Sequence, residues 1–212
     1  MDLFGDYSKR AEVSPFIQLL WEKGSLYEKK VINGLSLPFL DLSPYKELDK
    51  ERRTLEAMNA GTPLIYSGRI SSGDLLGEPD LLRKEGSAYI AGDIKSGSGE
   101  DGDEDNRKLK KHYAVQLALY TDVLEKMGKS TERRAFVWDI HGEEVPYDFS
   151  MATSEKHLEN LWDYYLSAQD KARHILARET ETLPAYSSGL CKNCVWYAAC
   201  QEQLVKNDDL TL

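Results

Sequence analysis

Two aspartates and a lysine are spaced so that they could carry out phosphodiester chemistry. Asp80 follows Pro79, and Asp93 and Lys95 form an Asp-Ile-Lys triplet further along the chain. Residues 84–87 (KEGS) are a turn signal between two apolar runs, so a β-hairpin is predicted that brings both aspartates to one end of adjacent strands. Asp93 and Lys95 are two residues apart and therefore leave the same face of the sheet.

Two carboxylates and an amine on one face are suited to a magnesium-dependent phosphodiesterase. Mg²⁺ takes oxygen ligands and keeps several waters, so one or two protein carboxylates are enough. Asp80 and Asp93 are the predicted ligands, with the main-chain carbonyl of Ile94 as a third. The cation would polarise the phosphate and activate a water, and Lys95 would stabilise the developing charge. The alternative is a surface hairpin that carries a salt bridge.

Two positions on predicted helices could complete this site. Gln116 and Tyr120 are four residues apart and share one helix face. The amide can hold a phosphate or a water and the phenol can hydrogen-bond nearby; alternatively, Tyr120 belongs to the core and Gln116 borders it. Glu28 lies one helical turn after Gly24 and could supply another metal ligand, whereas an isolated glutamate there would face solvent.

The charge balance restricts how the chain could bind nucleic acid. The net charge is −9, which argues against a passive, sequence-independent binder, because such proteins are normally basic. A local patch can still lie on an acidic body. The predicted patch directly follows the acidic residues 100–105 and consists of Arg107, Lys108, Lys110, Lys111 and His112. The alternative interpretation is a solvated loop and helix start.

The chain has 3 cysteines, all near its C-terminal end. Cys191, Cys194 and Cys200 form a C-x₂-C-x₅-C pattern, and an odd, clustered set argues against disulfides. Zinc and iron–sulfur sites both remain open, and both normally take four protein ligands. His174 is a weak zinc candidate because it has no His or Cys partner at ligand spacing. Three buried free cysteines are the alternative.

Periodicity predicts the elements that must position these residues. A chain of 212 residues is long enough for one domain with a substantial core, and no internal repeat is evident. The order of elements predicts an α/β layer fold over residues 1–212, with a C-terminal helical cysteine clasp at about residues 186–206. Helices are predicted at 15–33, 46–60, 109–127, 154–178 and 195–204; strands at 64–70, 75–82, 88–95, 134–140 and 145–149; and a loop at 96–106.

The sequence also bears on location. No apolar run approaches the length of a membrane span, and the first residues do not resemble a secretory signal. A cytoplasmic protein is therefore expected, associated with the nucleoid when it acts on DNA.

Taken in order, these motifs resemble one nuclease family. The motifs are Gly24-x₃-Glu28, Gly77-Glu78-Pro79-Asp80, Asp93-Ile94-Lys95, Gln116-x₃-Tyr120 and C-x₂-C-x₅-C. They are similar to the RecB-like branch of the PD-(D/E)XK nucleases, and within it to the iron–sulfur exonucleases related to the CRISPR-adaptation exonuclease and the AddB nuclease domain. The resemblance covers nearly the whole chain. It implies a restriction-endonuclease-like core, with a central mixed β-sheet flanked by helices, and Mg²⁺- or Mn²⁺-dependent cleavage of DNA, often 5′-to-3′ on single strands.

The resemblance also implies residue roles. Asp80 and Asp93 resemble the metal ligands and Lys95 the catalytic lysine. Gln116 and Tyr120 resemble the helix motif that positions the nucleic acid, beside the patch residues Lys108, Lys110 and Lys111.

Two features depart from the family pattern. Glu28 stands where the family commonly has a histidine, and a carboxylate there can still bind a hard cation. Relatives with a [4Fe-4S] cluster take a fourth cysteine from near the N-terminus, and this chain has none there. We expect that the chain has lost the cluster or that it begins downstream of the natural cysteine.

The sequence thus favours a divalent-metal-dependent DNA exonuclease that acts on single strands or ends. A protein partner in a repair, recombination or spacer-acquisition complex is compatible with this expectation. Two alternatives stay open at this point: a non-catalytic DNA- or protein-binding module on the same fold, and a zinc-stapled interaction domain.

Overall fold

The protein divides into two compact units. The computed structural model describes residues 5–102, 107–154, 157–177, 187, 189 and 191–208. One unit is Leu26–Ala172, and the other combines Met1–Ser25 with Arg173–Leu212. Residues 186, 188 and 190 of the predicted cysteine clasp lie outside the described residues. Within the described ranges, no helix is long and apolar enough to cross a membrane.

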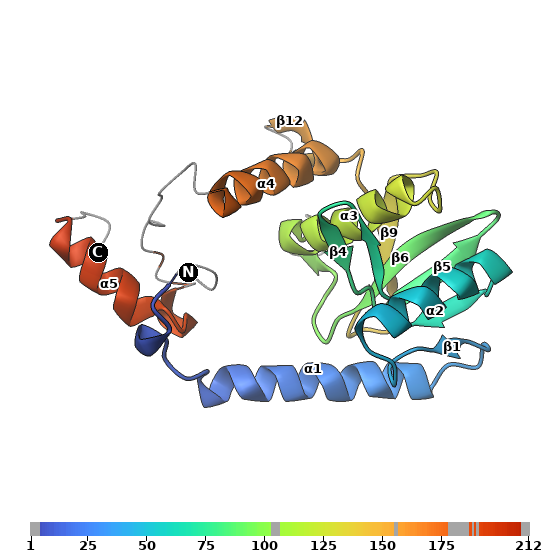
Figure 1. The fold of residues 1–212 in the computed structure, drawn as a ribbon, viewed down its shortest axis with the longest axis horizontal. Coiled ribbons are helices and arrows are strands. Elements are labelled where there is room, and N and C mark those ends of the chain that lie inside the picture. The colour runs from blue at the N-terminus through green and yellow to red at the C-terminus, as the bar shows by residue number, and fades with distance from the viewer. Residues whose placement is uncertain are drawn as a thin grey trace. The chain divides into compact units, whose positions relative to one another are not determined.

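A mixed sheet of six strands forms the centre of the larger unit. Its strand order is β1-β2-β5-β6-β9-β10 (Figure 1). The pairs β1–β2 and β6–β9 are parallel, and the remaining neighbours are antiparallel. The strands are β1 (Leu40–Asp41), β2 (Leu64–Tyr66), β5 (Leu81–Glu85), β6 (Ala88–Ile94), β9 (Arg134–Trp138) and β10 (Glu144–Asp148).

Outside this sheet, the described residues of the two units form helices and three small two-stranded sheets. The helices are α1 (Pro15–Asn33), α2 (Glu47–Ala60), α3 (Lys111–Lys126), α4 (Leu161–Leu176) and α5 (Tyr197–Lys206), with 3-10 turns at Tyr7–Lys9 and Cys191–Asn193. The small sheets are β3 (Ile70–Ser72) with β4 (Leu75–Gly77), β7 (Glu100–Asp101) with β8 (Lys108–Leu109), and β11 (Ala152–Ser154) with β12 (His157–Asn160).

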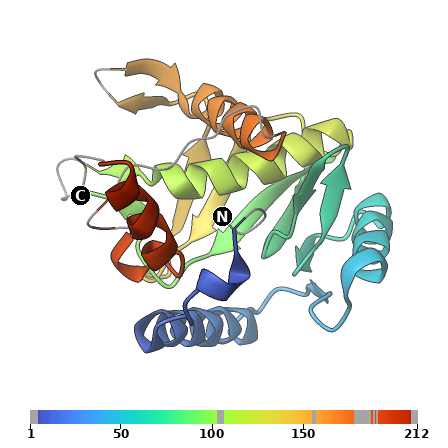
Figure 2. The same ribbon diagram turned by 60° about the vertical axis from the view of Figure 1, so that its left-hand side comes forward.

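Apolar side chains cover both faces of the sheet. The predicted stripe of α3, including Leu117 and Leu124, is buried in a core that also contains Val137 of β9. Figure 2 shows α3 lying along this face. On the other face, Phe136 of β9 packs in a second core with Ile32, near the end of α1. The predicted α/β fold, with a central mixed sheet flanked by helices, is confirmed.

One glycine of β6 is required by close packing. A Cβ built at Gly92 would lie 2.2 Å from the ring of Phe136 on the neighbouring strand. Gly92 and Asp93 point to opposite faces because successive strand residues alternate. The absence of a side chain at Gly92 therefore lets Phe136 fill the core directly behind Asp93.

Several predicted boundaries are wrong. The predicted strand 75–82 is two strands, because Pro79 lacks the N–H that would continue the ladder. The predicted strand 64–70 is broken at Ser67, which has a left-handed φ of 56°. The long helix predicted from residue 154 begins at Leu161, where Asn160 accepts a hydrogen bond from the amide of Asp163 at 2.8 Å.

Two further expectations differ in the same way. The segment 96–106, predicted as a loop, contains β7, while residues 103–106 lie outside the described residues. Leu109, predicted on a helix, pairs in β8 with Glu100, and α3 begins two residues later.

Candidate active site

The β5–β6 hairpin forms as predicted and brings the two aspartates together. Leu81 pairs with Gly92 across the hairpin, so the residues just beyond this pair, Asp80 and Asp93, lie at the same end. One carboxylate oxygen of Asp80, Oδ2, accepts a hydrogen bond from the amide of Ile94 at 2.8 Å. This bond fixes the Asp80 side chain across the strand end.

Burial makes this pair of carboxylates unusual. Asp93 is only 1% exposed. The burial of Asp80, together with the nearby charge of Asp93, raises the pKa of the Asp80 carboxyl from 3.8 to about 8. Asp80 is half-buried and Asp93 fully buried, and two neighbouring carboxylates in such a place resist simultaneous ionisation unless a cation lies between them. The pair therefore has the electrostatics of a cation site.

Lys95 and α3 complete a polar chain on the same face. The ammonium of Lys95 contacts Oδ2 of Asp93 as an ion pair and donates to Oε1 of Gln116 at 3.1 Å. The Gln116 amide in turn donates to the hydroxyl of Tyr120 at 2.8 Å. Gln116 is therefore part of the polar site, while Tyr120, which is 6% exposed, belongs both to the core and to the site.

Tyr120 is held by close contact as well as by its hydrogen bond. A Cβ built at Gly77 would lie 2.5 Å from the Tyr120 ring. Burial, and then the charge of Asp93, raises the pKa of the Tyr120 hydroxyl, so it is neutral and can donate a proton to a hydrogen bond. The glycine of the Gly-Glu-Pro-Asp motif thus makes room for the phenol beside the carboxylates.

Glu28 also lies near Asp80. Its Oε1 accepts a hydrogen bond from the hydroxyl of Tyr66 at 2.8 Å, and its charge contributes to the raised pKa of Asp80. Glu28 is half-buried rather than fully solvated. Tyr66, at the end of β2, is a partner that the sequence did not suggest.

The main chain of Asp80 is held by α2, which the sequence did not connect to the site. The amide of Ser67 donates to the Asp80 carbonyl at 2.7 Å, and Lys50 donates to the Ser67 hydroxyl at 3.0 Å. One turn along α2, the hydroxyl of the fully buried Thr54 accepts from the amide of Arg69 at 3.0 Å. These bonds stabilise the left-handed backbone at Ser67.

Arg69 extends this support to the residue beside Pro79. Its guanidinium pairs with Glu78 at 2.5 Å and with Glu51 of α2 at 3.5 Å. The Glu-Pro-Asp segment is therefore held at Glu78 by a side chain and at Asp80 by the main chain. No periodic pattern marks these α2 residues, because in the sequence they look like an ordinary polar helix face.

The predicted patch residues lie along β8 and the start of α3. Two ammonium groups lie near the ring centroid of Tyr113, that of Lys95 at 5.2 Å and that of Lys110 at 5.3 Å. Lys111 lies 5.0 Å from the ring of Tyr164, and Lys108 is exposed. Tyr113 thus lies within cation–π reach of both Lys95 and the patch residue Lys110.

The carboxylate pair fits a hard divalent cation. Oδ2 of Asp93 is buried and, among the described residues, accepts no hydrogen bond of good geometry despite its contact with Lys95. A buried carboxylate oxygen whose hydrogen-bonding capacity is not filled is suited to a metal. Over the same residues, no three or more His, Cys, Asp or Glu side chains converge into a set that could hold a metal. A site of two carboxylates completed by waters is what Mg²⁺ requires.

The cysteines lie in the smaller unit. Burial, and then the nearby thiols of Cys194 and Cys191, raises the pKa of the Cys200 thiol. All three are free, and within the described ranges they do not converge into a metal-holding set.

Comparison with known proteins agrees with this geometry. A family model described as the PD-(D/E)XK nuclease superfamily matches residues 18–201, a span that includes Glu28, Asp80, Asp93 and Lys95. No curated protein matches the chain. The six-stranded mixed sheet with its flanking helices is the restriction-endonuclease-like fold. The chain therefore belongs to the PD-(D/E)XK nuclease superfamily.

Proposed function

We propose that this protein is a Mg²⁺- or Mn²⁺-dependent DNA exonuclease of the RecB-like branch, acting on single strands or ends. Membership of the superfamily supports a metal-dependent nuclease. The observation that carries the proposal is the buried Asp80–Asp93 pair with Lys95 on the same face. A non-catalytic module would have no need to place two carboxyl groups together at a desolvated strand end, where ionising both is costly without a cation.

The proposed catalytic roles follow from the contacts. Asp80 and Asp93 would hold the cation, with Glu28 as an accessory ligand and the carbonyl of Ile94 as a further one. When bound, the cation supplies charge stabilisation and lowers the pKa of water. Asp93 and Gln116 hold the ammonium of Lys95 on the face of the sheet that carries Asp93, where it would stabilise negative charge on the phosphoryl oxygens.

Gln116 and Tyr120 act on the substrate and on Lys95 together. The Gln116 carboxamide is held at both ends, by the ammonium of Lys95 and the hydroxyl of Tyr120. It therefore keeps the lysine from swinging away. The neutral Tyr120 hydroxyl keeps its proton available for a phosphate oxygen.

The patch beside the site supports a polyanionic substrate. Lys108, Lys110 and Lys111 directly precede or begin the helix that carries Gln116. Because the whole chain has a net charge of −9, attraction for phosphates must be local to such a patch. A partner protein in a repair, recombination or spacer-acquisition complex could extend this surface.

We propose separately that Cys191, Cys194 and Cys200 are, or descend from, a structural iron–sulfur or zinc clasp. Their C-x₂-C-x₅-C spacing supports it, as does the effect of two thiols on the pKa of the third. A fourth ligand would have to come from outside this set of cysteines.

The function is tested by degradation of end-labelled single- and double-stranded DNA in Mg²⁺, Mn²⁺ or EDTA. Asp93→Ala and Lys95→Ala are expected to lower the rate by at least about 10²–10³-fold, as loss of one preorganised charge does elsewhere. A ladder that shortens from one end would establish exonuclease action and its polarity. Wild-type rates in either variant would refute the residue assignment, and equal rates in EDTA would refute the metal dependence.

A further inference from the structure

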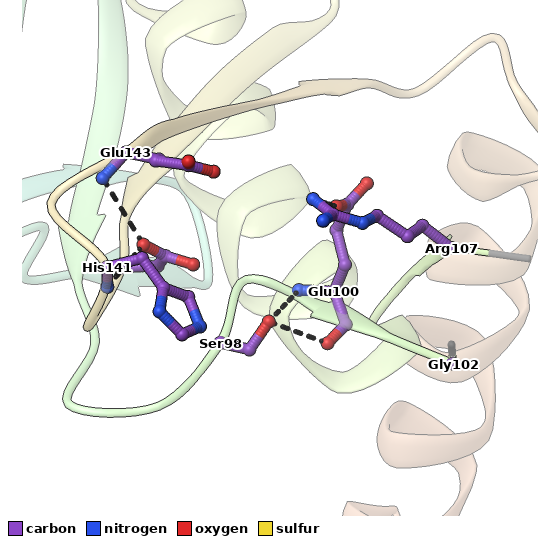
Figure 3. A pocket seen from close by; sticks show the side chains of 7 residues that line it. Ser98, Glu100, Gly102, Arg107, His141 and Glu143 are labelled. Atoms are coloured by element: carbon purple, nitrogen blue, oxygen red, sulfur yellow. Dashed lines mark hydrogen bonds and ion pairs between the residues drawn. The ribbon is translucent and has the colours of Figure 1, made fainter. Parts of the chain in front are cut away.

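A cavity lies beside the loop that follows Lys95. It has a volume of about 430 Å³, within the 300–1,000 Å³ typical of small-ligand sites. Ser98 and Glu100 line one side of the cavity, and Arg107, which directly precedes β8, lines another. His141 and Glu143 come from the turn between β9 and β10. Figure 3 shows the His141 ring and the Arg107 guanidinium both directed toward the space between these elements.

Hydrogen bonds hold the walls of this cavity in place. The carboxylate of Asp139, which is 2% exposed, accepts from the amides of Gly99 at 3.2 Å and His141 at 2.9 Å. The hydroxyl of Tyr147 donates to the Gly99 carbonyl at 2.6 Å, and the Ile140 amide donates to the Gly97 carbonyl at 3.3 Å. The glycine-rich loop after Lys95 is thus fixed to the ends of β9 and β10. The cavity is preformed.

The charges of the lining select against a phosphate. Glu100 and Glu143 both line the cavity, and the guanidinium of Arg107 is paired with Glu100 at 3.5 Å. Among the described residues, a phosphate group would meet three carboxylates, that of Asp139 included, and one partly neutralised guanidinium. Carboxylate oxygens do match the amino and imino donors on the edges of nucleobases, as when Glu or Asp accepts from cytosine.

His141 supplies the second element of base recognition. It is exposed, and its ring faces the cavity (Figure 3). Aromatic side chains, histidine included, stack on unpaired bases of single strands. Stacking on His141 with hydrogen bonding to Glu100 or Glu143 would hold a planar, uncharged, donor-bearing ring.

The position of the cavity matches a strand bound at the catalytic residues. Ser98 follows Lys95 by three residues, so their Cα atoms are at most ~11 Å apart. That distance corresponds to about three stacked nucleotides at ~3.4 Å each. Asp93, Lys95 and the cavity all lie at the carboxyl ends of the parallel strands β6 and β9.

We propose that this cavity binds one nucleobase of the strand being cleaved, within about three nucleotides of the scissile phosphodiester. The inference rests on the proposed nuclease function and adds to it a site that reads bases rather than phosphates. An unpaired base is required, since a base within a duplex could not enter the cavity. The site therefore favours single-stranded DNA or frayed ends.

The test asks whether removing one base from the DNA and removing the His141 side chain weaken binding through the same contact. Short single-stranded oligonucleotides, each with one abasic position, are titrated by fluorescence anisotropy in an Asp93→Asn background that prevents cleavage. One abasic position should weaken binding by about 5- to 150-fold, which corresponds to the 1–3 kcal/mol of one base–aromatic stack. In the His141→Ala protein the same abasic position should cause no further loss, and His141→Phe should restore the penalty.

Two controls distinguish the base-binding site from the proposed nuclease activity. Trp21→Ala removes an exposed aromatic side chain of α1 that belongs neither to the patch nor to the cavity lining, and it should keep the abasic penalty. A fully abasic strand should be cleaved at equal rates by the otherwise wild-type protein and by His141→Ala. Abasic penalties that are equal with and without His141, or absent altogether, would overturn the base site alone. If the abasic penalty depends on His141 but the protein with Asp93 intact cleaves no DNA, the proposed nuclease function would be wrong and the base-binding site would still stand.

Discussion

The pKa of Asp80 is raised further from its ordinary value than that of any other described residue of the site. Its carboxyl is buried beside Asp93, with Glu28 nearby, and its one described main-chain donor is the Ile94 amide. Without a cation, the neutral form of Asp80 is favoured because desolvation and two like charges oppose ionisation. Divalent metal binding must then displace a proton from Asp80.

The raised pKa of Asp80 predicts how metal-free stability depends on pH. Between its ordinary pKa of 3.8 and its folded value of about 8, the folded state binds more protons at Asp80 than the unfolded state does. The free energy of unfolding therefore falls as pH rises through this window. Thermal unfolding in EDTA should show this fall in the wild type, and Asp80→Asn should flatten it. Identical pH profiles for the two proteins would contradict the raised pKa.

At the scale of elements, α2 acts as the support for the Glu-Pro-Asp segment. Lys50 and Thr54 bind the chain at Ser67 and Arg69, and Ser67 in turn binds the Asp80 carbonyl. A carboxylate ligand must be held close to its productive position, so a shift of this segment should weaken the cation site. α2 is thus expected to influence metal affinity although none of its residues is a proposed ligand.

Thr54→Val tests this support. The change preserves shape but leaves the Arg69 amide without its acceptor, which should lower the free energy of unfolding by about 1–3 kcal/mol. It should also raise the Mn²⁺ concentration needed for half-maximal cleavage. Thr121→Val is the matched control, because this equally buried threonine donates to the Leu117 carbonyl within α3. If both variants lose stability and neither changes the metal requirement, α2 has only a structural role.

Features set within one or two elements could be predicted from the sequence, whereas contacts between distant elements could not. The β5–β6 hairpin, the shared face of Asp93 and Lys95, and the apolar stripe of α3 follow from spacing within one or two elements, and all are found. The hydrogen bonds from α2 to Ser67 and Arg69 join residues in different elements, and no periodicity of the sequence predicts such contacts. The break at Pro79 was readable from the missing N–H, and the helix start at Asn160 from its capping side chain.

At the scale of the whole molecule, the chemistry and the cysteines lie in different compact units. Asp80, Asp93 and Lys95 belong to Leu26–Ala172, whereas the three cysteines belong to the unit that includes Arg173–Leu212. A metal held by the cysteines would therefore contribute to the folding of the smaller unit. Superfamily membership covers both units, because the matched residues 18–201 extend into each.

This separation gives a prediction for Cys191→Ser. Protein prepared without oxygen should carry iron or zinc, and the variant should lose that metal and unfold at a lower temperature. Its cleavage rate per folded molecule in Mn²⁺ should stay at the wild-type level. Metal analysis with calorimetry decides the point: unchanged metal content in Cys191→Ser, or no metal in either protein, would show that the cysteines form no clasp.

The most direct measurement is a Mn²⁺ titration followed by the electron paramagnetic resonance of the free ion, on the wild type, Asp93→Asn and Asp122→Asn. Asp122 is a matched control, since it is a buried carboxylate of α3 that accepts from the Tyr165 hydroxyl at 2.8 Å. We predict Mn²⁺ binding in the wild type and in Asp122→Asn, and its loss in Asp93→Asn. Equal binding by all three folded proteins would contradict the assignment of Asp80 and Asp93 as the cation site.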